Sequence, residues 1–432
     1  MHNQRQLSDN ARRTICRLAF LLTCALPTCM TGYWIFHPQT ANGWQQSIQA
    51  QLAVETSVVS VECKGPYETI LRGVQFNDPE LGTLLKATQV RVILGDTNLI
   101  HVESPVTVSS RALVRILDRV RESLIRSHTA DQPWQVAFGR TTITADLPDV
   151  QYQPSVVATG MVIDVIPYDD ATAVTARLYL ENDLTGSPVQ CYFHQGAGEL
   201  QDRREFGIET GSNFLPAWLV SDLVLDVSGL GTDCEFTGRV DVQPESTGAI
   251  NAQVSGFFRS IDLEQLVAPY GQSLRGTCDF QINRCEITGN QVHSMSAHAM
   301  SKWGVIGIQT LASAVQHLGL TVPFQPSEMD IEFTGLNLLC EIEQGRLSLS
   351  GPQGGVIAYT RSATDGVGNA LLVSNGSPRK NMLDFANFLV CPDDIEPKVY
   401  DQRLVTVLSR FYVPEPRFAS GAIDAIDAPQ LR

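Results

Sequence analysis

The feature that most restricts the fold of this chain is an alternation of apolar and polar residues with a period of two. Between Ala173 and Glu181 the even positions from 174 to 180 are apolar and the positions between them are mostly polar. The same pattern recurs over residues 234–242, 250–258, 278–282 and 329–333. Successive side chains of a strand point to opposite faces, so these segments predict strands with one buried and one solvated face. We therefore predict a mainly β (α+β) fold built on a long, mostly antiparallel sheet.

Shorter strand patterns lie nearer the N-terminus. We predict strands over residues 57–63, 69–76, 88–94 and 99–108. The last of these is interrupted near Pro105, because proline cannot donate a ladder hydrogen bond. Asn77-Asp78-Pro79 and Gly95-Asp96 are the clearest turn signals between them.

Apolar residues at helical spacing are confined to a few segments, so few helices are available to cover the sheet. These segments are residues 42–52, 109–126, 260–267, 301–318 and 379–389. The segment 109–126 is amphipathic, and Ser109 or Ser110 can supply its N-cap. Its basic face carries Arg111, Arg115 and Arg119 among other arginines. We interpret that face as solvated, with a position on a membrane surface as the alternative.

A charge-free apolar stretch, residues 18–36, predicts an N-terminal transmembrane helix, because its length is close to the ~20 residues needed to cross a bilayer. Arginines precede it and the next Lys or Arg is Lys64, so the N-terminus is expected in the cytoplasm and the remaining chain across the membrane. A cleaved signal peptide and a lipid-modified Cys24 or Cys29 are the alternatives. The residues assigned to the anchor are Leu18, Phe20, Leu21, Leu22, Leu26, Tyr33, Trp34, Ile35 and Phe36.

The charge balance limits the partners. The formal net charge of the chain is −15. An acidic exported region is not expected to bind nucleic acid or anionic lipid head groups by bulk electrostatics. Of ten cysteines, seven lie beyond the apolar stretch, and their spacing leaves two interpretations open, small core residues or disulfides.

No signature of catalysis is present, so we predict no enzyme activity, no cofactor and no metal site. The sequence contains no G-x-S-x-G, H-E-x-x-H, Walker or G-x-G-x-x-G motif. His293 and His298 are five apart, which places them on opposite faces of a strand. The acidic pairs Asp169-Asp170 and Asp393-Asp394 lie near prolines, where aspartate commonly serves turns.

Residues 71–94, placed behind an apolar N-terminal segment, resemble the start of AsmA-like envelope proteins. Residues 234–242, 250–266 and 274–282, with the helix through Leu318, are similar to the C-terminal regions of that family. The resemblance implies a single-pass inner-membrane protein of double-membrane bacteria whose bulk is periplasmic. It also implies a curved sheet with an apolar inner groove, phospholipid as a ligand and roles in lipid transport or outer-membrane biogenesis, with other envelope proteins as possible partners.

Two functions follow as hypotheses, a lipid-handling groove protein or a structural envelope protein with a dry β-sandwich core and no ligand. The expected regions are a cytoplasmic tail (1–17), the anchor (18–36), a membrane-proximal β region (41–130), a central β-rich region (131–320) and a C-terminal β/helix region with a loose tail (321–432). The positions predicted to line a groove are Leu178, Leu180, Phe236, Val240, Val254, Phe258, Phe280 and Ile282.

Overall fold

The computed structural model divides the chain into two compact units, Met1–Arg203 and Arg204–Arg432. Of the described residues, 57% lie in strands and 21% in helices, so the fold is mainly β, as predicted. The regions predicted with boundaries at 130 and 320 stay predictions. The structure describes residues 13–14, 17, 20–25, 28, 41–52, 54–65, 67–103, 105–126, 133–146, 153–167, 171–181, 186–196, 204–223, 227–245, 247–324, 329–352, 355–360, 369–376, 379–390 and 409–411.

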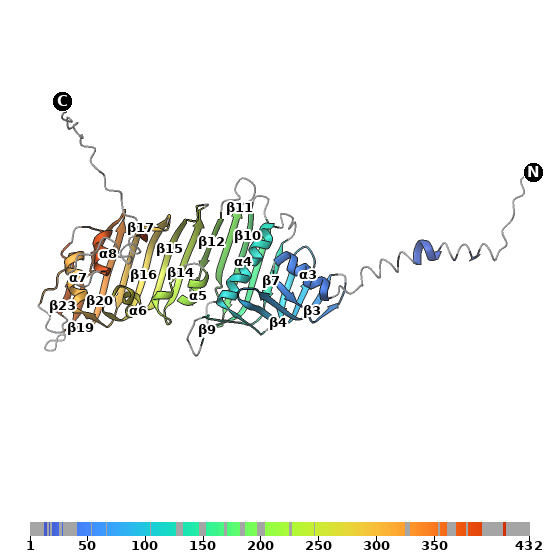
Figure 1. Ribbon diagram of the computed structural model, residues 1–432, viewed down its shortest axis with the longest axis horizontal. Helices are drawn as coiled ribbons and strands as arrows, with labels where there is room; N and C mark the ends of the chain where they lie inside the picture. The colour runs from blue at the N-terminus through green and yellow to red at the C-terminus, as the bar shows by residue number, and fades with distance from the viewer. Residues whose placement is uncertain are drawn as a thin grey trace, which may run out of the picture. The chain divides into compact units, whose positions relative to one another are not determined.

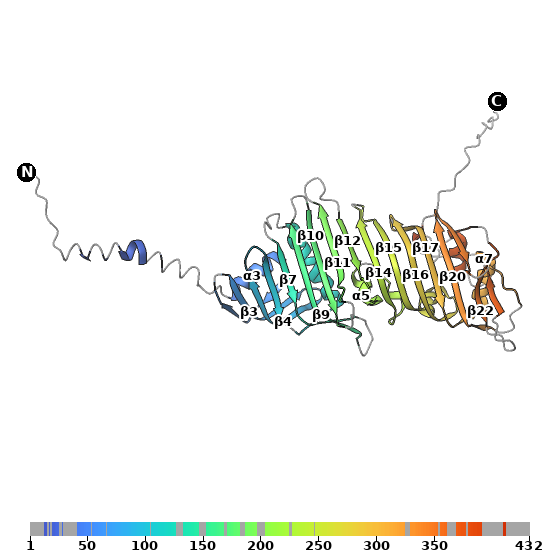
Figure 2. The ribbon, with the colours of Figure 1, turned by 180° about the vertical axis from the view of Figure 1, so that it is seen from behind.

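Unit 1 contains a mixed sheet and two helices that cover one of its faces. Figure 1 shows α3 and α4 in front of the strands, and Figure 2 shows the same strands from the uncovered side. Its elements are α3 (Ala41–Leu52), β1 (Glu55–Ser57), β2 (Ser60–Cys63), β3 (Glu68–Asp78), β4 (Gly82–Ile93), β5 (Asn98–Glu103), β6 (Val106–Ser109), α4 (Ser110–Arg126), β7 (Trp134–Phe138), β8 (Thr141–Thr144), β9 (Ser155–Pro167), β10 (Ala171–Leu180) and β11 (Val189–Gly196).

Most strand pairs of unit 1 are antiparallel. Strands β1 and β2 pair with successive parts of β3, and β4 pairs with β3 and β5. The exceptions are β5 with β7 and β6 with β8, which are parallel and are connected through α4. The break between β5 and β6 falls beside Pro105, as the sequence predicts.

Helix α4 forms where the period of the sequence changes from two to helical. The Ser109 hydroxyl accepts a hydrogen bond from the Ala112 amide at 3.2 Å, which caps the first turn. Ala112 and Leu113 are buried, and the helix packs on β4, β6, β8 and β10. The apolar stripe of this helix therefore packs on the sheet, as predicted.

Unit 2 contains a second series of paired strands and its own short helices. Figure 1 shows these helices on the near side of the strands, with the opposite side bare in Figure 2. Its elements are β12 (Arg204–Glu209), β13 (Leu215–Pro216), α5 (Ala217–Leu223), β14 (Glu235–Pro244), β15 (Ile250–Asp262), α6 (Leu263–Val267), β16 (Leu274–Thr288), β17 (Gln291–Ser301), β18 (Gly304–Gly307), α7 (Ile308–Leu318), β19 (Asp330–Phe333), β20 (Gly335–Glu343), β21 (Arg346–Ser350), β22 (Val356–Thr360), β23 (Asn369–Val373), β24 (Lys380–Asn381) and α8 (Met382–Val390).

All the strand pairs of unit 2 that the structure describes are antiparallel. Strands β14, β15, β16, β17 and β20 pair in that order. Two β-bulges interrupt the pairing of β15 with β16, and Ser260 beside the second has a positive φ of 59°. Bulges bend a strand and increase its twist, so this part of the sheet departs from a flat surface.

Glycines in unit 2 lie beneath aromatic rings. Gly238 and Gly256 are directly opposite each other on β14 and β15, with φ of 148° and 155°. A Cβ on Gly256 would come within 2.7 Å of the Phe236 ring, and one on Gly304 within 2.2 Å of the Phe333 ring. These positions need glycine because the ring and the neighbouring backbone occupy the space of a side chain.

The prediction of a helix over residues 301–318 is wrong for residues 301–307. Residues 304–307 form β18, which pairs with β16 and β19, and the helix begins only at Ile308. Gly304 and Gly307 lie where a Cβ would collide with Phe333 and Ser273, so close packing with distant strands takes precedence over the helical spacing. The helix predicted over 260–267 is also shorter, because β15 continues to Asp262 and the Asp262 carboxylate caps α6 through the Glu264 and Gln265 amides.

Little of the predicted anchor falls within the described residues. Leu18, Leu26 and residues 33–36 lie outside them, and Leu21 and Leu22 lie in a five-residue π-helix, Leu21–Ala25. Phe20 is 65% exposed. Among the residues that the structure describes, no helix is both long enough and apolar enough to span a bilayer.

The cysteines that the structure describes all carry free thiols, and the buried ones among them fit the small-core-residue interpretation. Cys234, Cys278 and Cys285 are buried, and Cys24 and Cys63 are exposed. Burial raises the pKa of Cys278 and Cys285 to about 11. It raises the pKa of Cys191, Cys234 and Cys340 to about 12.

We expect alkylation of the native protein at pH 8 to modify Cys63 and to leave Cys191, Cys234 and Cys340 unmodified, since the reactive species is the thiolate. Peptide mass spectrometry after treatment with iodoacetamide measures this. Unfolding in denaturant before treatment is the control and should make the buried thiols reactive. Modification of Cys234 at the rate of Cys63 in the native protein would contradict the placement of this thiol.

Candidate functional site

The residues predicted to line a groove all belong to the apolar faces of strands. Leu178 and Leu180 lie on β10 in unit 1, where Leu178 is 3% exposed and Leu180 is half-buried. The other six lie on β14, β15 and β16 in unit 2. We call the face of the unit 2 strands that carries these six residues the inner face.

Strand register brings the inner-face residues of unit 2 together in rows that run across the strands. One row is Phe236, Phe258, Phe280, Ala299 and Leu338; the next is Gly238, Gly256, Ile282, Ala297 and Cys340; a third is Val240, Val254, Cys285, Met295 and Ile342. The sequence predicts the alternation in each strand but not these rows, because register depends on the bulges and turns.

The inner face is closed at its β14–β15 side. Phe236 and Phe258 are 0% and 5% exposed, and their ring centroids are 4.7 Å apart. Val240 and Val254 are also buried. Among these four residues the apolar surface is therefore already covered by protein atoms.

The inner face changes character at β17, where its residues are small. Ala297 and Ala299 lie between Phe280 and Ile282 of β16 and Leu338 and Cys340 of β20. The flanking four are only half-buried, in contrast to Phe236 and Phe258. We call these six residues the alanine strip. Within the strip, the larger side chains lie on either side of the two alanines at the spacing of neighbouring strands, about 4.8 Å.

The opposite face of the same strands is polar. Arg259 forms an ion pair with Glu235 across β14 and β15, and Arg284 forms one with Glu286 along β16. His298 shares a hydrogen bond with Asn337, so it has a protein partner on this face. Neither His293 nor His298 takes part in a metal-binding cluster among the described residues.

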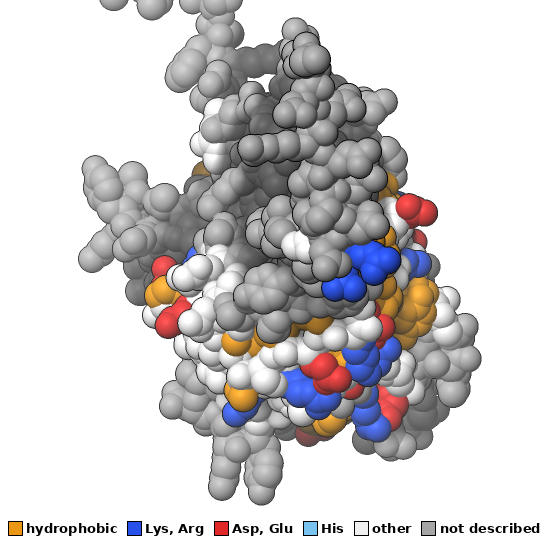
Figure 3. All heavy atoms as spheres, turned by 90° about the vertical axis from the view of Figure 1, so that its right-hand side faces the viewer, with side chains coloured by type: hydrophobic (Ala, Val, Ile, Leu, Met, Phe, Trp, Pro, Cys, Tyr) orange, Lys and Arg blue, Asp and Glu red, His pale blue; other side chains and the backbone are white. Residues whose placement is uncertain are grey.

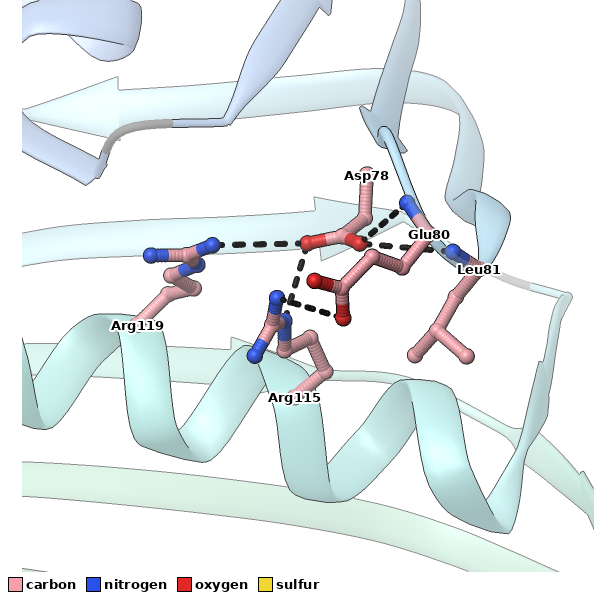
Figure 4. Close-up of polar contacts among 5 residues, drawn as sticks. All are labelled: Asp78, Glu80, Leu81, Arg115 and Arg119. Carbon is pink, nitrogen blue, oxygen red and sulfur yellow. Dashed lines mark hydrogen bonds and ion pairs between the residues drawn. The ribbon is translucent and has the colours of Figure 1, made fainter.

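A buried carboxylate in unit 1 was missed by the sequence analysis, which assigned Asp78 only to a turn. Asp78 is 3% exposed and lies at the end of β3. One of its oxygens accepts hydrogen bonds from the Glu80 and Leu81 amides at 2.9 and 3.3 Å. The other is 2.9 Å from Nε of Arg115 and 3.5 Å from a terminal nitrogen of Arg119 (Figure 4).

These contacts show that the basic face of α4 is not simply solvated. The Arg115 and Arg119 side chains are only 28% and 19% exposed, whereas Arg111 is 55% exposed and is 3.5 Å from Asp146. The spacing of Arg115 and Arg119, four apart on one helix face, is the signal that could have indicated a shared anionic partner. We call Asp78, Arg115 and Arg119 the α4 latch, because they join the helix to the β3–β4 hairpin.

The α4 latch predicts a dependence of stability on pH. The Arg115 hydrogen bond lowers the pKa of Asp78 from 3.8 to about 2, despite the opposing effect of burial. Because the folded pKa is the lower one, the stabilisation is present above about pH 4 and is lost as the pH falls toward 2.

We expect the backbone amides of α4 to lose protection from hydrogen exchange between pH 4 and pH 2, after correction for the intrinsic exchange rate. Mass spectrometry of α4 peptides from the full chain measures this. Peptides of β15 and β16 are the control. Unchanged protection of α4 across this range would contradict a stabilising role of the ionised carboxylate.

No protein-family model matches the sequence, and no curated protein matches it either.

Proposed function

We propose that this protein is a membrane-anchored protein of the bacterial envelope whose exported sheet handles lipid, in lipid transport or outer-membrane biogenesis. The observation that carries this proposal is the set of half-buried apolar side chains in the alanine strip, Phe280, Ile282, Leu338 and Cys340, on one face of the unit 2 strands; Ala297 and Ala299 between them are 2% and 9% exposed. The resemblance of residues 71–94 and 234–318 to AsmA-like proteins supports the same function. The proposed ligand is a phospholipid.

The alanine strip has the chemistry that an acyl chain requires. Its side chains are apolar, and burial raises the pKa of the Cys340 thiol to about 12, as expected in a poorly hydrated environment. Small residues between larger ones let a linear hydrocarbon lie close to the strand backbone. We propose that an acyl chain lies along the half-buried side chains of Phe280, Ile282 and Leu338, over the two alanines, and that the lipid head group remains in water.

The proposed anchor places this surface outside the cytoplasm, with the chain held in the inner membrane. One contact of the N-terminal segment and the exposure of one side chain agree with a helix in lipid. The Thr28 hydroxyl donates a hydrogen bond of 2.6 Å to the Cys24 carbonyl, which satisfies a polar group that hydrocarbon cannot. Phe20 is mostly exposed and so is not covered by the folded units.

Site-specific photocrosslinking tests the lipid proposal. Leu338 and Leu339 are neighbours on β20 and are both half-buried, but they point to opposite faces. A benzophenone amino acid at 338 should form phospholipid adducts in cells, and the same group at 339 should not. Mass spectrometry of the protein purified in mild detergent should also detect bound phospholipid. Absence of bound lipid together with equal or no crosslinking at 338 would refute the proposal.

The burial of Phe236, Val240 and Phe258 favours a second candidate, a structural envelope protein with a dry core. Under that hypothesis the alanine strip is covered by protein as well. Ala299→Leu distinguishes the two, because extra methyl groups in a dry, packed site cost about 1–3 kcal/mol of unfolding free energy. A lipid surface accepts the leucine with little loss of stability but binds less phospholipid. Ser296→Leu, on the polar face of the same strand, is the matched control.

A further inference from the structure

One end of unit 1 carries exposed apolar side chains that the fold does not use. Strands β2 and β3 are joined by a turn that contains Tyr67, which is 68% exposed. Leu94, directly after β4, is 43% exposed, and its amide donates a 2.9 Å hydrogen bond to the Tyr67 carbonyl. Lys64 precedes Tyr67 in the same turn and is also exposed. We call Lys64, Tyr67 and Leu94 the hairpin end.

The direction of α3 shows where the preceding chain arrives. The Gln45 side chain of α3 donates a hydrogen bond of 3.2 Å to the Val58 carbonyl, and the helix ends at Leu52, shortly before Glu55. From Leu52 back to Gln45, α3 therefore runs alongside the chain from Glu55 to Val58. A helix rises about 1.5 Å per residue, so Ala41 lies about 6 Å beyond Gln45 in the same direction.

That direction leads toward the hairpin end. Strand β1 begins opposite Asn77, and β2 finishes opposite Thr69, at the start of β3. The start of β3 is the end of the sheet where Tyr67 and Leu94 lie. The first turn of α3 and the hairpin end are therefore on the same side of unit 1.

Only residues 37–40 separate α3 from the predicted anchor. Four residues span at most about 14 Å when fully extended. If residues 18–36 cross the bilayer, α3 begins close to its outer surface, and the hairpin end faces the same surface.

We propose that the hairpin end is a second membrane contact, with Tyr67 and Leu94 inserted into the interface of the bilayer that holds the N-terminal anchor. This proposal rests on the proposed anchor. Tyrosine favours the membrane interface, leucine favours the hydrocarbon below it, and a lysine stem can extend along the boundary with its ammonium in water. The contact fixes the orientation of unit 1 relative to the membrane, which an anchor followed by a short linker does not.

The charges near the hairpin end fit a contact made by insertion rather than by attraction to anionic lipid. Arg91 near the end of β4 is 3.7 Å from Glu68 and 3.5 Å from Glu103, so two carboxylates outweigh its positive charge. Lys64 and Asp96 are both exposed and of opposite sign. Figure 3 shows basic and acidic side chains next to each other on the side of the molecule that it presents, with hydrophobic side chains among them.

Strand β4 supplies a matched pair of positions for the test. Leu81 precedes β4 and is 42% exposed, close to the value for Leu94, but it lies at the opposite end of the strand. The benzophenone amino acid is placed singly at 67, 94 or 81 in the full chain, reconstituted in vesicles of phosphatidylethanolamine and phosphatidylglycerol. After irradiation, phospholipid adducts are quantified by mass spectrometry, and flotation of the vesicles reports whether the chain is bound.

We expect several-fold more lipid adduct at 67 and 94 than at 81, and little change with added salt. If the chain floats with the vesicles but 67 and 94 give no more adduct than 81, the hairpin-end proposal is wrong and the anchor stands. If the chain does not float with the vesicles, the anchor is wrong, and this proposal fails with it. If the probe at 94 disturbs folding, the probe at 67 still gives a result, because there it replaces the exposed ring of Tyr67 by another aromatic group.

Discussion

Replacing Asp78 by asparagine is expected to lower the free energy of unfolding of unit 1 by about 2–4 kcal/mol at neutral pH. The lowered pKa alone, about 2 against 3.8, corresponds to about 2 kcal/mol of preferential interaction with the ionised carboxylate. The amide of asparagine presents no net charge to Arg115 and Arg119, which are largely buried. Denaturant dependence of hydrogen exchange in peptides of β3, β4 and α4 measures the change in the full chain.

Glu80→Gln is the matched control for Asp78→Asn. Glu80 also forms an ion pair with Arg115, at 3.3 Å, but its side chain is 76% exposed. Exposed ion pairs contribute about 0–1 kcal/mol, so this variant should remain close to wild type. Equal losses in the two variants would show that burial of Asp78 is not the source of its effect.

Gly238→Ala is expected to destabilise unit 2 by about 3 kcal/mol. A Cβ at this position would meet the Ser255 carbonyl oxygen at 2.3 Å and the Gly256 Cα at 2.4 Å. Its φ of 148° adds backbone strain for any residue with a side chain. Both obstacles are backbone atoms of the paired strand, so relief requires β14 and β15 to separate. Hydrogen exchange in peptides of these two strands measures the loss.

Gly160→Ala provides the comparison for this prediction. Gly160 also lies within a strand, β9, but its nearest neighbour to a Cβ would be the Phe138 carbonyl oxygen at an ordinary 3.8 Å. Its φ is not among the positive values. We expect no loss of stability in this variant. A neutral Gly238→Ala variant would show that the close approach of β14 and β15 is not required.

Local patterns predicted the elements of this protein where local forces decide them. The strand over residues 69–76, the interruption near Pro105 and the helix over 109–126 follow from alternation, proline chemistry and helical spacing, and the structure confirms them. The helix predicted over 379–389 is confirmed at its end, where α8 stops at Val390, but not at its start, because Lys380 and Asn381 pair with β21 and the helix begins at Met382. In these segments the spacing of apolar side chains and the local backbone preferences favour the same secondary structure.

Contacts between distant residues explain what the sequence did not predict. The helix predicted over 301–318 includes residues 304–307, yet they pair with two strands that are separated from them along the chain. The α4 latch joins residues separated by 37 positions, and neither side of it has a local signature of burial. The alanine strip depends on register across β16, β17 and β20, which bulges shift by whole residues. Pairing, ion pairs and register of this kind depend on two segments at once, so the pattern within a single segment does not predict them.

The series of neighbouring hairpins in unit 2 has a consequence for how such chains can vary. Strands β14, β15, β16 and β17 are paired in the order of the chain, and β16 makes a further pairing with β18 through Leu274, Arg275 and Gly276. Insertion or deletion of one whole hairpin would change the width of the sheet by about 10 Å, and the remaining strands would keep their apolar faces on the same side. The width of the unit 2 sheet can therefore change in evolution without a change in which face is apolar.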